Sequence, residues 1–180
     1  MQLKLDDPRF FATLISIISE LVTEVRLKVT KEGMHLVALD PANVAMVHFK
    51  IPAELFSQFE LEKDETLGIN LDNLSSVLRR CSLGSSLIMS RQENTLKLTI
   101  QDKIKRDFTL ALISIEGEDR EWPQWEFKSV IKMDSKAFVE VVEDCLVVSD
   151  ACTFIAEPNK FIVEARGLNS ARAEFSSDEV

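Results

Sequence analysis

The sequence contains few of the residues on which catalysis and metal binding usually depend. Its 180 residues include only two histidines, His35 and His48, and five glycines. No glycine-rich phosphate loop and no spacing typical of metal ligands is present. Carboxylates are plentiful, yet none belongs to a recognisable acid/base pair. We therefore expect no catalytic residue, no metal site and no cofactor, and a binding protein rather than an enzyme.

Long apolar runs are also absent. No stretch approaches the ~18 residues that span a membrane, and the N-terminus lacks the basic and apolar regions of a signal peptide. Three cysteines, Cys81, Cys145 and Cys152, match no zinc or redox pattern, and their apolar neighbours favour buried, reduced thiols. With 46% hydrophobic residues the chain has ample material for a packed core. We expect a soluble, intracellular protein with no membrane partner.

An excess of basic residues is lacking as well. Lys and Arg number 21 against 30 Asp and Glu, which gives a net charge of −9. This balance argues against a protein that covers nucleic acid with its whole surface. Any contact with a polyanion is therefore expected to come from a local patch.

The acidic segment 116–127, with the sequence EGEDREWPQWEF, divides the chain. It contains both tryptophans, and Pro123 between them prevents it from continuing a helix interior or a central strand. We interpret it as a connector between a first domain at residues 1–115 and a second domain at residues 128–180.

Hydrophobic periodicity predicts the elements of the first domain. A helix is expected after Asp6, Asp7 and Pro8, an acidic cap with an early proline. Its apolar stripe comprises Phe10, Phe11, Leu14, Ile15, Ile18, Leu21 and Val22. A second helix is expected from Asp72, with Gly84 ending it. Period-two alternation predicts strands at residues 25–30, 34–38, 44–51, 66–71, 87–90, 95–100 and 105–113.

The second domain shows a similar but shorter series. A strand is expected at residues 129–133, followed by a helix capped by Asp134 or Ser135. Three strands follow at residues 151–156, 160–166 and 170–177. The second helix and later strands of the first domain have no counterpart before Val180. The chain is expected to be either a naturally short form or a fragment.

The two domains repeat one design. A shift of 127 positions superposes the helices and the hairpins, and their apolar positions coincide. The matched pairs are Phe11 with Phe138, Leu14 with Val141, Ile15 with Val142, Ile18 with Cys145, Leu21 with Val148, Leu27 with Phe154, Met34 with Phe161, Leu36 with Val163 and Ala38 with Ala165. Such self-similarity is typical of a duplicated architecture.

Four segments, taken together and in order, carry a family resemblance. They are DPANVAMV, INLDNLSSVLRRC, RDFTLALI and PQWEFKSVIKMDSKAF. The chain thereby resembles, from Met1 to Val180, the archaeal and eukaryotic sliding clamps of the proliferating cell nuclear antigen family. Relative to that family, about the last quarter is absent. The resemblance implies an α+β protein of two similar clamp-type domains, with helices lining the inner face, antiparallel sheets outside and the second domain incomplete.

The resemblance also implies a function and partners. Three subunits would form a ring that encircles duplex DNA without sequence specificity and tethers DNA polymerase, the clamp loader and other replication or repair proteins. A closed ring holds DNA topologically and needs only weak phosphate contacts, so a net negative charge is compatible with this role. The expected location is the cytoplasm or nucleoid if the protein is archaeal and the nucleus if it is eukaryotic.

Basic residues on the inner helices are the DNA-binding candidates that the resemblance implies. They are Arg9, Arg79, Arg80 and Lys136, which are also compatible with ordinary solvated cations. The third helix departs from the family, because Glu140 and Glu143 stand where basic residues are usual. These carboxylates weaken the prediction of DNA contact for that helix.

The resemblance implies a subunit contact between the strand before the connector and the third strand of the second domain in the next subunit. The residues concerned are Arg106, Phe108, Leu110 and Leu112 in the first strand and Ala171, Ala173 and Phe175 in the last. Both are expected to be edge strands, which pair readily with another chain. Glu143 and Asp144, with Glu140, are hypothesised to face Arg79, Arg80, Lys105 or Arg106 across this joint.

A partner-binding site is implied beside the connector, where clients of the family insert an aromatic-containing motif. The matching residues are Leu39, Asn43, Val44, Trp122 and Pro123. An exposed tryptophan is a plausible binding hot spot. The other interpretation is that Trp122 and Trp125 pin the connector to the sheet.

The sequence leaves three hypotheses. The first is a non-enzymatic clamp that acts as a processivity factor. The second is a specialised clamp-like subunit of a heteromeric ring, which the acidic third helix favours. The third is a small-molecule enzyme on an α+β scaffold, for which no convergent polar pocket is visible in the sequence.

Overall fold

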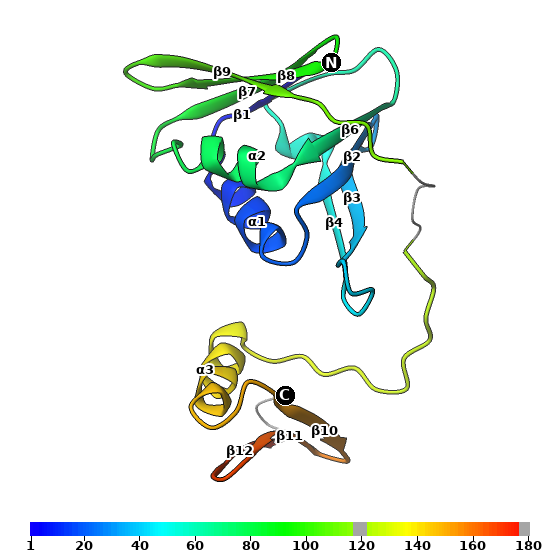
Figure 1. The fold of residues 1–180 in the computed structure, drawn as a ribbon, viewed down its shortest axis with the longest axis vertical. Coiled ribbons are helices and arrows are strands. Elements are labelled where there is room, and N and C mark those ends of the chain that lie inside the picture. Colours follow the sequence, from blue (N-terminus) through cyan, green and yellow to red (C-terminus); the bar gives the residue numbers. More distant parts are fainter. Residues whose placement is uncertain (117–121, 177–180) are drawn as a thin grey trace. The chain divides into compact units, whose positions relative to one another are not determined.

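The structure is a computed structural model that describes residues 1–116 and 122–176 (Figure 1). The chain forms two compact units, unit 1 at Met1–Pro123 and unit 2 at Gln124–Val180. The division falls inside the segment 116–127. No helix in the described ranges is long and apolar enough to cross a membrane.

Two antiparallel sheets build unit 1. The larger has the strand order β5-β1-β7-β8-β9, and the smaller has the order β4-β3-β2-β6. The strands of the larger sheet are β1 (Gln2–Leu5), β5 (Gln58–Glu60), β7 (Ser86–Gln92), β8 (Thr95–Gln101) and β9 (Lys105–Ala111). Those of the smaller sheet are β2 (Glu24–Thr30), β3 (Gly33–Leu39), β4 (Met46–Pro52) and β6 (Glu65–Asn70).

Helices α1 (Arg9–Ser19) and α2 (Leu71–Leu78) lie side by side and close the core of unit 1 (Figure 1). A short 3-10 helix, η1 (Ala53–Leu55), follows β4. Phe11 and Ile15 of α1 are completely buried, and Leu71 and Leu74 of α2 are almost completely buried. The apolar sides of both helices therefore join the inner residues of the strands in one core.

Unit 2 packs one helix on a small antiparallel sheet. Its elements are α3 (Ser135–Leu146), β10 (Thr153–Glu157), β11 (Lys160–Arg166) and β12 (Ser170–Ser176), with the strand order β10-β11-β12. Cys145 of α3 packs with Phe161, Val163 and Ala165 of β11. The Asp134 carboxylate accepts hydrogen bonds from the backbone N–H groups of Lys136 and Ala137, so the predicted cap of this helix is Asp134.

The repeat is visible in the elements. The 127-residue shift carries β3 onto β11 end to end, and α1 onto α3 to within one residue. The match is incomplete at the surface, because Leu27 is 2% exposed whereas its counterpart Phe154 is 53% exposed. The loops before the third strands also differ, since residues 40–45 precede β4 but only residues 167–169 precede β12.

Several sequence predictions of secondary structure were wrong. Residues 129–133 form no strand. Their counterpart β1 is paired on both sides, with β5 and β7, whereas the strands described in unit 2 pair only with one another. An isolated strand leaves its backbone groups unpaired, so it is not maintained. The short strands β1 and β5 were not predicted.

Helix boundaries also differ from the predictions. The α2 helix begins at Leu71 and is capped by the Asn70 side chain, which accepts from the Asn73 N–H. It ends at Leu78, where bonds of the i to i−3 type tighten the chain, and Gly84 lies in the following loop with φ +83°. Pro8, not an acidic residue, is the N-cap of α1.

The predicted apolar stripe of α1 is wider than the buried face. Phe10 is 39% and Leu21 45% exposed, while Ile17, assigned to neither face, is 60% exposed. The remaining members of the stripe are buried or half-buried. The third strand starts at Met46 rather than at Val44, and Ser177 at the predicted end of the last strand lies outside the described residues.

Candidate functional site

The loop between β3 and β4, residues 40–45, is organised by one carboxylate and is called the Asp40 loop. The Asp40 Oδ1 atom accepts hydrogen bonds from the N–H groups of Val44 and Ala45, each at 2.7 Å, and Oδ2 accepts from Ala42 N–H at 3.2 Å. The bond from Ala45, followed by those from Val44 and Ala42, lowers the pKa of Asp40. Hydrogen bonds to its first residue, Asp40, thus fix the conformation of the loop.

Three of the predicted partner-binding residues lie on or beside the Asp40 loop. Asn43 has φ +58° and donates its N–H to the Asp40 carbonyl oxygen at 2.9 Å. This left-handed conformation is one that asparagine adopts readily. Val44 is consequently presented to solvent, 86% exposed, and half-buried Leu39 closes the end of β3. Leu39 also lines a hollow of about 330 Å³ together with Val22, Thr23, Glu24 and Pro41.

Trp122 lies against the outer face of the smaller sheet of unit 1. Its ring stacks on His48 of β4, with centroids 5.2 Å apart and planes 30° apart. His48 pairs with Val37 of β3, one step along the same face from the pair Leu39–Met46. Trp122 remains 40% exposed, and Pro123 is half-buried.

The structure therefore places the Asp40 loop and the Trp122 ring at the same pair of strands, β3 and β4. It also adds His48, which the sequence did not identify as a binding residue. Alternation along β4 places His48 on the outward face, but its contact with Trp122 is tertiary. The two interpretations of Trp122 are compatible, because the ring is anchored on one side and exposed on the other.

The basic residues predicted to contact DNA differ in their surroundings. Arg9 at the start of α1 forms an ion pair with Asp7 at 2.6 Å. The Arg9 guanidinium lowers the pKa of the Asp7 carboxyl to about 2, and Asp7 in turn raises the pKa of Arg9. The charge of Arg9 is therefore balanced locally over the whole physiological pH range.

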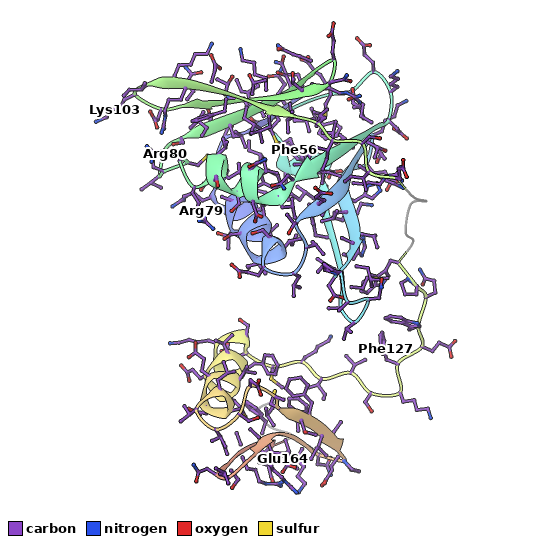
Figure 2. All side chains as sticks on the ribbon, in the orientation of Figure 1. Phe56, Arg79, Arg80, Lys103, Phe127 and Glu164 are labelled. Atoms are coloured by element: carbon purple, nitrogen blue, oxygen red, sulfur yellow. The ribbon has the colours of Figure 1, made fainter. Side chains whose placement is uncertain are left out.

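Arg79 and Arg80 are exposed at the end of α2, on the same side of unit 1 as Lys103 (Figure 2). Within the two described ranges neither arginine forms an ion pair. They line a hollow of about 640 Å³ with Cys81, Ser82, Leu83, Asp102, Lys103, Ile104 and Arg106. Arg106 bonds to the Asp102 carboxylate and to the Arg80 carbonyl oxygen. Arg79 and Arg80 thus remain available to an anionic partner.

The exposed side of α3 is predominantly acidic. Lys136 lies in its first turn, whereas Glu140, Glu143 and Asp144 follow on the exposed surface. This charge pattern makes α3 a poor phosphate-binding helix and a suitable partner for a basic surface.

The two strands predicted to join subunits are both sheet edges. In the part of the chain that the structure describes, β9 pairs only with β8, and β12 pairs only with β11. Each is seven residues long. Other described strands also end their sheets, among them β4, which is equally long. Strands β9 and β12 each offer a backbone edge that another chain can extend.

The side chains of the predicted interface point largely into their own units. Phe108, Leu110 and Leu112 pack against the core of unit 1. Ala171 and Phe175 pack against the core of unit 2, and Ala173 is half-buried. A contact at these strands would therefore rest mainly on backbone hydrogen bonds, with the side chains fixing the edge in place.

These features define a class of protein. A helix on a three-stranded antiparallel meander occurs twice, in units joined through the segment 116–127, and this duplication defines a two-domain α+β protein of the DNA-clamp type. Residues 1–121 match the family model described as "Proliferating cell nuclear antigen, N-terminal domain". The chain belongs to the proliferating cell nuclear antigen family.

Relatives and solved structures agree with this assignment. The chain is 36% identical over 163 residues to a DNA polymerase sliding clamp of Thermococcus onnurineus, covering 90% of this chain and 66% of the relative. For the Pyrococcus furiosus sliding clamp the identity is 35% over 158 residues, covering 87% and 64%. The chain thus spans slightly less than two thirds of the length of these curated relatives.

The fold matches known crystal structures over nearly the whole chain. A chain from the PCNA2-PCNA3 complex of Sulfolobus tokodaii superposes with a TM-score of 0.86 at 26% identity, covering 99% of this chain and 74% of that chain. The proliferating cellular nuclear antigen of Entamoeba histolytica gives 0.91 at 21% identity, covering 98% and 74%, and supports the fold alone.

Proposed function

We propose that this chain is a subunit of a ring-shaped sliding clamp. The ring encircles duplex DNA and tethers DNA polymerase, the clamp loader and other replication or repair proteins, without catalysing a reaction. Relatives named as DNA polymerase sliding clamps support this proposal. Its location would be intracellular, at the nucleoid of an archaeon or in the nucleus of a eukaryote.

The observation that carries the proposal is a seven-residue edge strand in each unit, β9 in unit 1 and β12 in unit 2. Head-to-tail pairing of β9 in one subunit with β12 in the next uses two different surfaces, and such contacts close into a ring when the rotation permits. Closure removes both open edges. DNA is then held by topology, so the net charge of −9 does not oppose the function.

The decisive experiment separates topological retention from ordinary affinity. The protein is mixed with linear duplex DNA, the DNA is circularised by ligation, and the mixture is passed through a gel-filtration column at high salt. Retention on circles, with release when a restriction enzyme cuts them, is expected. Equal retention on circular and linear DNA would contradict an encircling ring.

A second candidate is a specialised subunit of a heteromeric ring. The acidic surface of α3, with Glu140, Glu143 and Asp144, favours it, because these residues suit a basic partner surface better than DNA. The Sulfolobus tokodaii structure contains two different clamp chains. Light scattering distinguishes the candidates, since a trimer of this chain supports a homomeric ring and a monomer suits a heteromeric subunit.

We expect the double substitution Glu143→Lys/Asp144→Lys to lower the oligomer mass at low salt. The proposed reason is that these carboxylates face Arg79, Arg80, Lys105 or Arg106 of the next subunit, so reversal places like charges together. Light scattering at low salt measures the effect. The control Glu126→Lys/Asp150→Lys changes the net charge equally at other exposed positions of unit 2 and should leave the mass unchanged. An unchanged mass in the first variant means that the pairing hypothesis is wrong.

Arg79→Gln is expected to reduce the salt dependence of DNA binding more than Arg9→Gln does. Each phosphate contact contributes a slope of about −0.9 to the plot of log K against log salt. Arg79 is free to make such a contact, whereas Arg9 is already paired with Asp7 at 2.6 Å. Fluorescence anisotropy of a labelled duplex at several salt concentrations gives the slopes. Equal slope changes in the two variants would show that Arg79 and Arg9 are equally available to contact DNA phosphates.

A further inference from the structure

Five basic or imidazole side chains gather on the outward face of the smaller sheet of unit 1. We call this set the basic strip. It consists of Arg26 and Lys28 on β2, His35 on β3, and His48 and Lys50 on β4. The inward-facing residues that alternate with them on β2 and β3 are buried. A concentration of positive charge on one face is notable in a chain with a net charge of −9.

Strand register places three members of the basic strip in one row. Lys28 is paired with His35, and His35 is paired with Lys50 on the next strand. Neighbouring strands lie about 4.8 Å apart, so the row carries a basic group on each of three successive strands. The fourth strand of the sheet, β6, continues this row with uncharged Thr66 opposite Lys28.

Most of the charged groups near His35 are basic, although Glu24 also faces outward at the start of β2. Burial, followed by the charges of Lys28, Lys50 and His48, lowers the pKa of His35, while Glu32 acts in the opposite direction as the smallest cause. Glu32 also pairs with Lys50 at 2.8 Å. Both partners of that ion pair are well exposed, and such pairs are worth little in water. On β6 the outward residues Thr66, Gly68 and Asn70 are uncharged.

The basic strip is continuous with the aromatic part of the candidate site. His48 belongs to the strip and also carries the stacked ring of Trp122, at a centroid distance of 5.2 Å. A client that placed an aromatic residue against Trp122 would therefore bring its flanking residues onto the strip. Charge complementarity then selects acidic flanking residues.

We propose that the basic strip binds a run of acidic residues that flanks the aromatic motif of a client protein. This inference rests on the proposed function, because it assigns a partner chemistry to the same docking site. A peptide is favoured over DNA because the strip adjoins Trp122 and lies on a sheet face, whereas the proposed ring contacts DNA through its helices. Nucleic acid is the competing outcome of the test.

The preference for acidic flanks depends on pH in a defined direction. His35 gains positive charge as the pH falls, so acidic peptides should bind more tightly at pH 6 than at pH 8. The lowered pKa of His35 places its contribution below the ordinary histidine range near 6.5. Lys28, Lys50 and Arg26 set the preference that remains at pH 8.

The experiment compares three synthetic peptides by fluorescence anisotropy. One carries an aromatic motif with acidic flanks, one carries the same motif with Gln and Asn flanks, and one carries the acidic run alone. At low ionic strength we expect the acidic flanks to improve the Kd about five-fold, the order expected for several exposed ion pairs. This advantage should largely disappear at 0.5 M salt, where the Debye length is only about 4 Å.

Two single-residue variants test whether the basic strip is responsible for the tighter binding of peptides with acidic flanks. Lys50→Gln removes a strip lysine that is paired with Glu32, and Lys97→Gln on β8 removes a lysine that is paired with Asp107 at 3.7 Å. Lys50→Gln should reduce the acidic advantage at least two-fold, and Lys97→Gln should leave it unchanged. The neutral-flanked peptide should bind the three proteins equally.

The outcomes separate this inference from the proposed function. If both aromatic peptides bind equally tightly, the docking site stands and the basic strip has no role in it. If the acidic run alone binds in a Lys50-dependent manner while the aromatic motif adds nothing, the strip is supported and the aromatic docking site is refuted. If a DNA oligonucleotide binds the strip and none of the peptides does, the acidic-peptide proposal is overturned.

Discussion

Trp122→Ala is expected to weaken the binding of an aromatic-containing client peptide by about 2 kcal/mol, or roughly thirty-fold in Kd. The indole is anchored on His48 at 5.2 Å and still 40% exposed, so it offers a rigid apolar face at little entropic cost. Isothermal titration calorimetry measures the Kd. The native fold of the variant is checked by circular dichroism.

Trp125→Ala is the matched control for this prediction. Trp125 is more exposed, at 58%, and packs edge-on against Phe127 in the same segment. The Trp125→Ala substitution removes a side chain of the same size without changing the stack of Trp122 on His48. Equal losses in the two variants would show that the connector binds clients through general apolar area, and an unchanged Kd for Trp122→Ala would exclude Trp122 as a docking residue.

Phe11→Ala is expected to lower the free energy of unfolding of unit 1 by about 3–5 kcal/mol. Phe11 is completely buried in the core beneath α1, so its removal leaves a cavity that neighbouring side chains fill only partly. Phe138, its counterpart 127 residues later, is only half-buried, so Phe138→Ala should destabilise unit 2 by less than half of that amount.

Native-state hydrogen exchange can measure both effects, because protection of β2 and β3 reports on unit 1 and protection of β11 reports on unit 2. Each substitution should reduce protection mainly in its own unit. If Phe138→Ala reduces protection in unit 2 as much as Phe11→Ala does in unit 1, the two side chains contribute equally to their cores. That result would contradict the expectation drawn from the lower burial of Phe138.

Much of the fold follows from local patterns in the sequence. The alternation of Val25, Leu27 and Val29 predicted β2, and the acidic cap at Asp134 predicted the start of α3. These signals are local, since each depends on the period of one element or on a side chain that reaches its own helix end. The repeat was predictable for the same reason, because buried positions retain apolar residues at matching intervals.

Features that depend on distant partners were not predictable from local patterns. Leu3 and Leu5 are too few to identify a strand, yet β1 is fixed because it pairs with both β5 and β7. Residues 129–133 are more apolar and form no strand, because such partners are missing from the described part of unit 2. Strand formation at these positions is decided by neighbours and not by composition.

The candidate site likewise combines features that local sequence patterns predict with features that depend on distant partners. The break between the strands predicted at residues 34–38 and 44–51 located the Asp40 loop, but the register that aligns Lys28, His35 and Lys50 depends on pairing between strands. The stack of Trp122 on His48 joins residues that are far apart in sequence, and neither residue alone signals it. The sequence thus nominated the residues of the proposed docking site, while their electrostatic surroundings required the structure.

The unequal loops of the two repeats have a consequence for stoichiometry. The Asp40 loop has six residues, whereas the corresponding loop of unit 2 has three, residues 167–169, which are too few to reproduce the carboxylate-centred turn. Duplication of the fold therefore did not duplicate the Asp40 loop. A ring built from this chain would offer one proposed docking site per protomer, so its valency for clients would equal its number of subunits. Different clients would then occupy different protomers of one ring without competing for the same site.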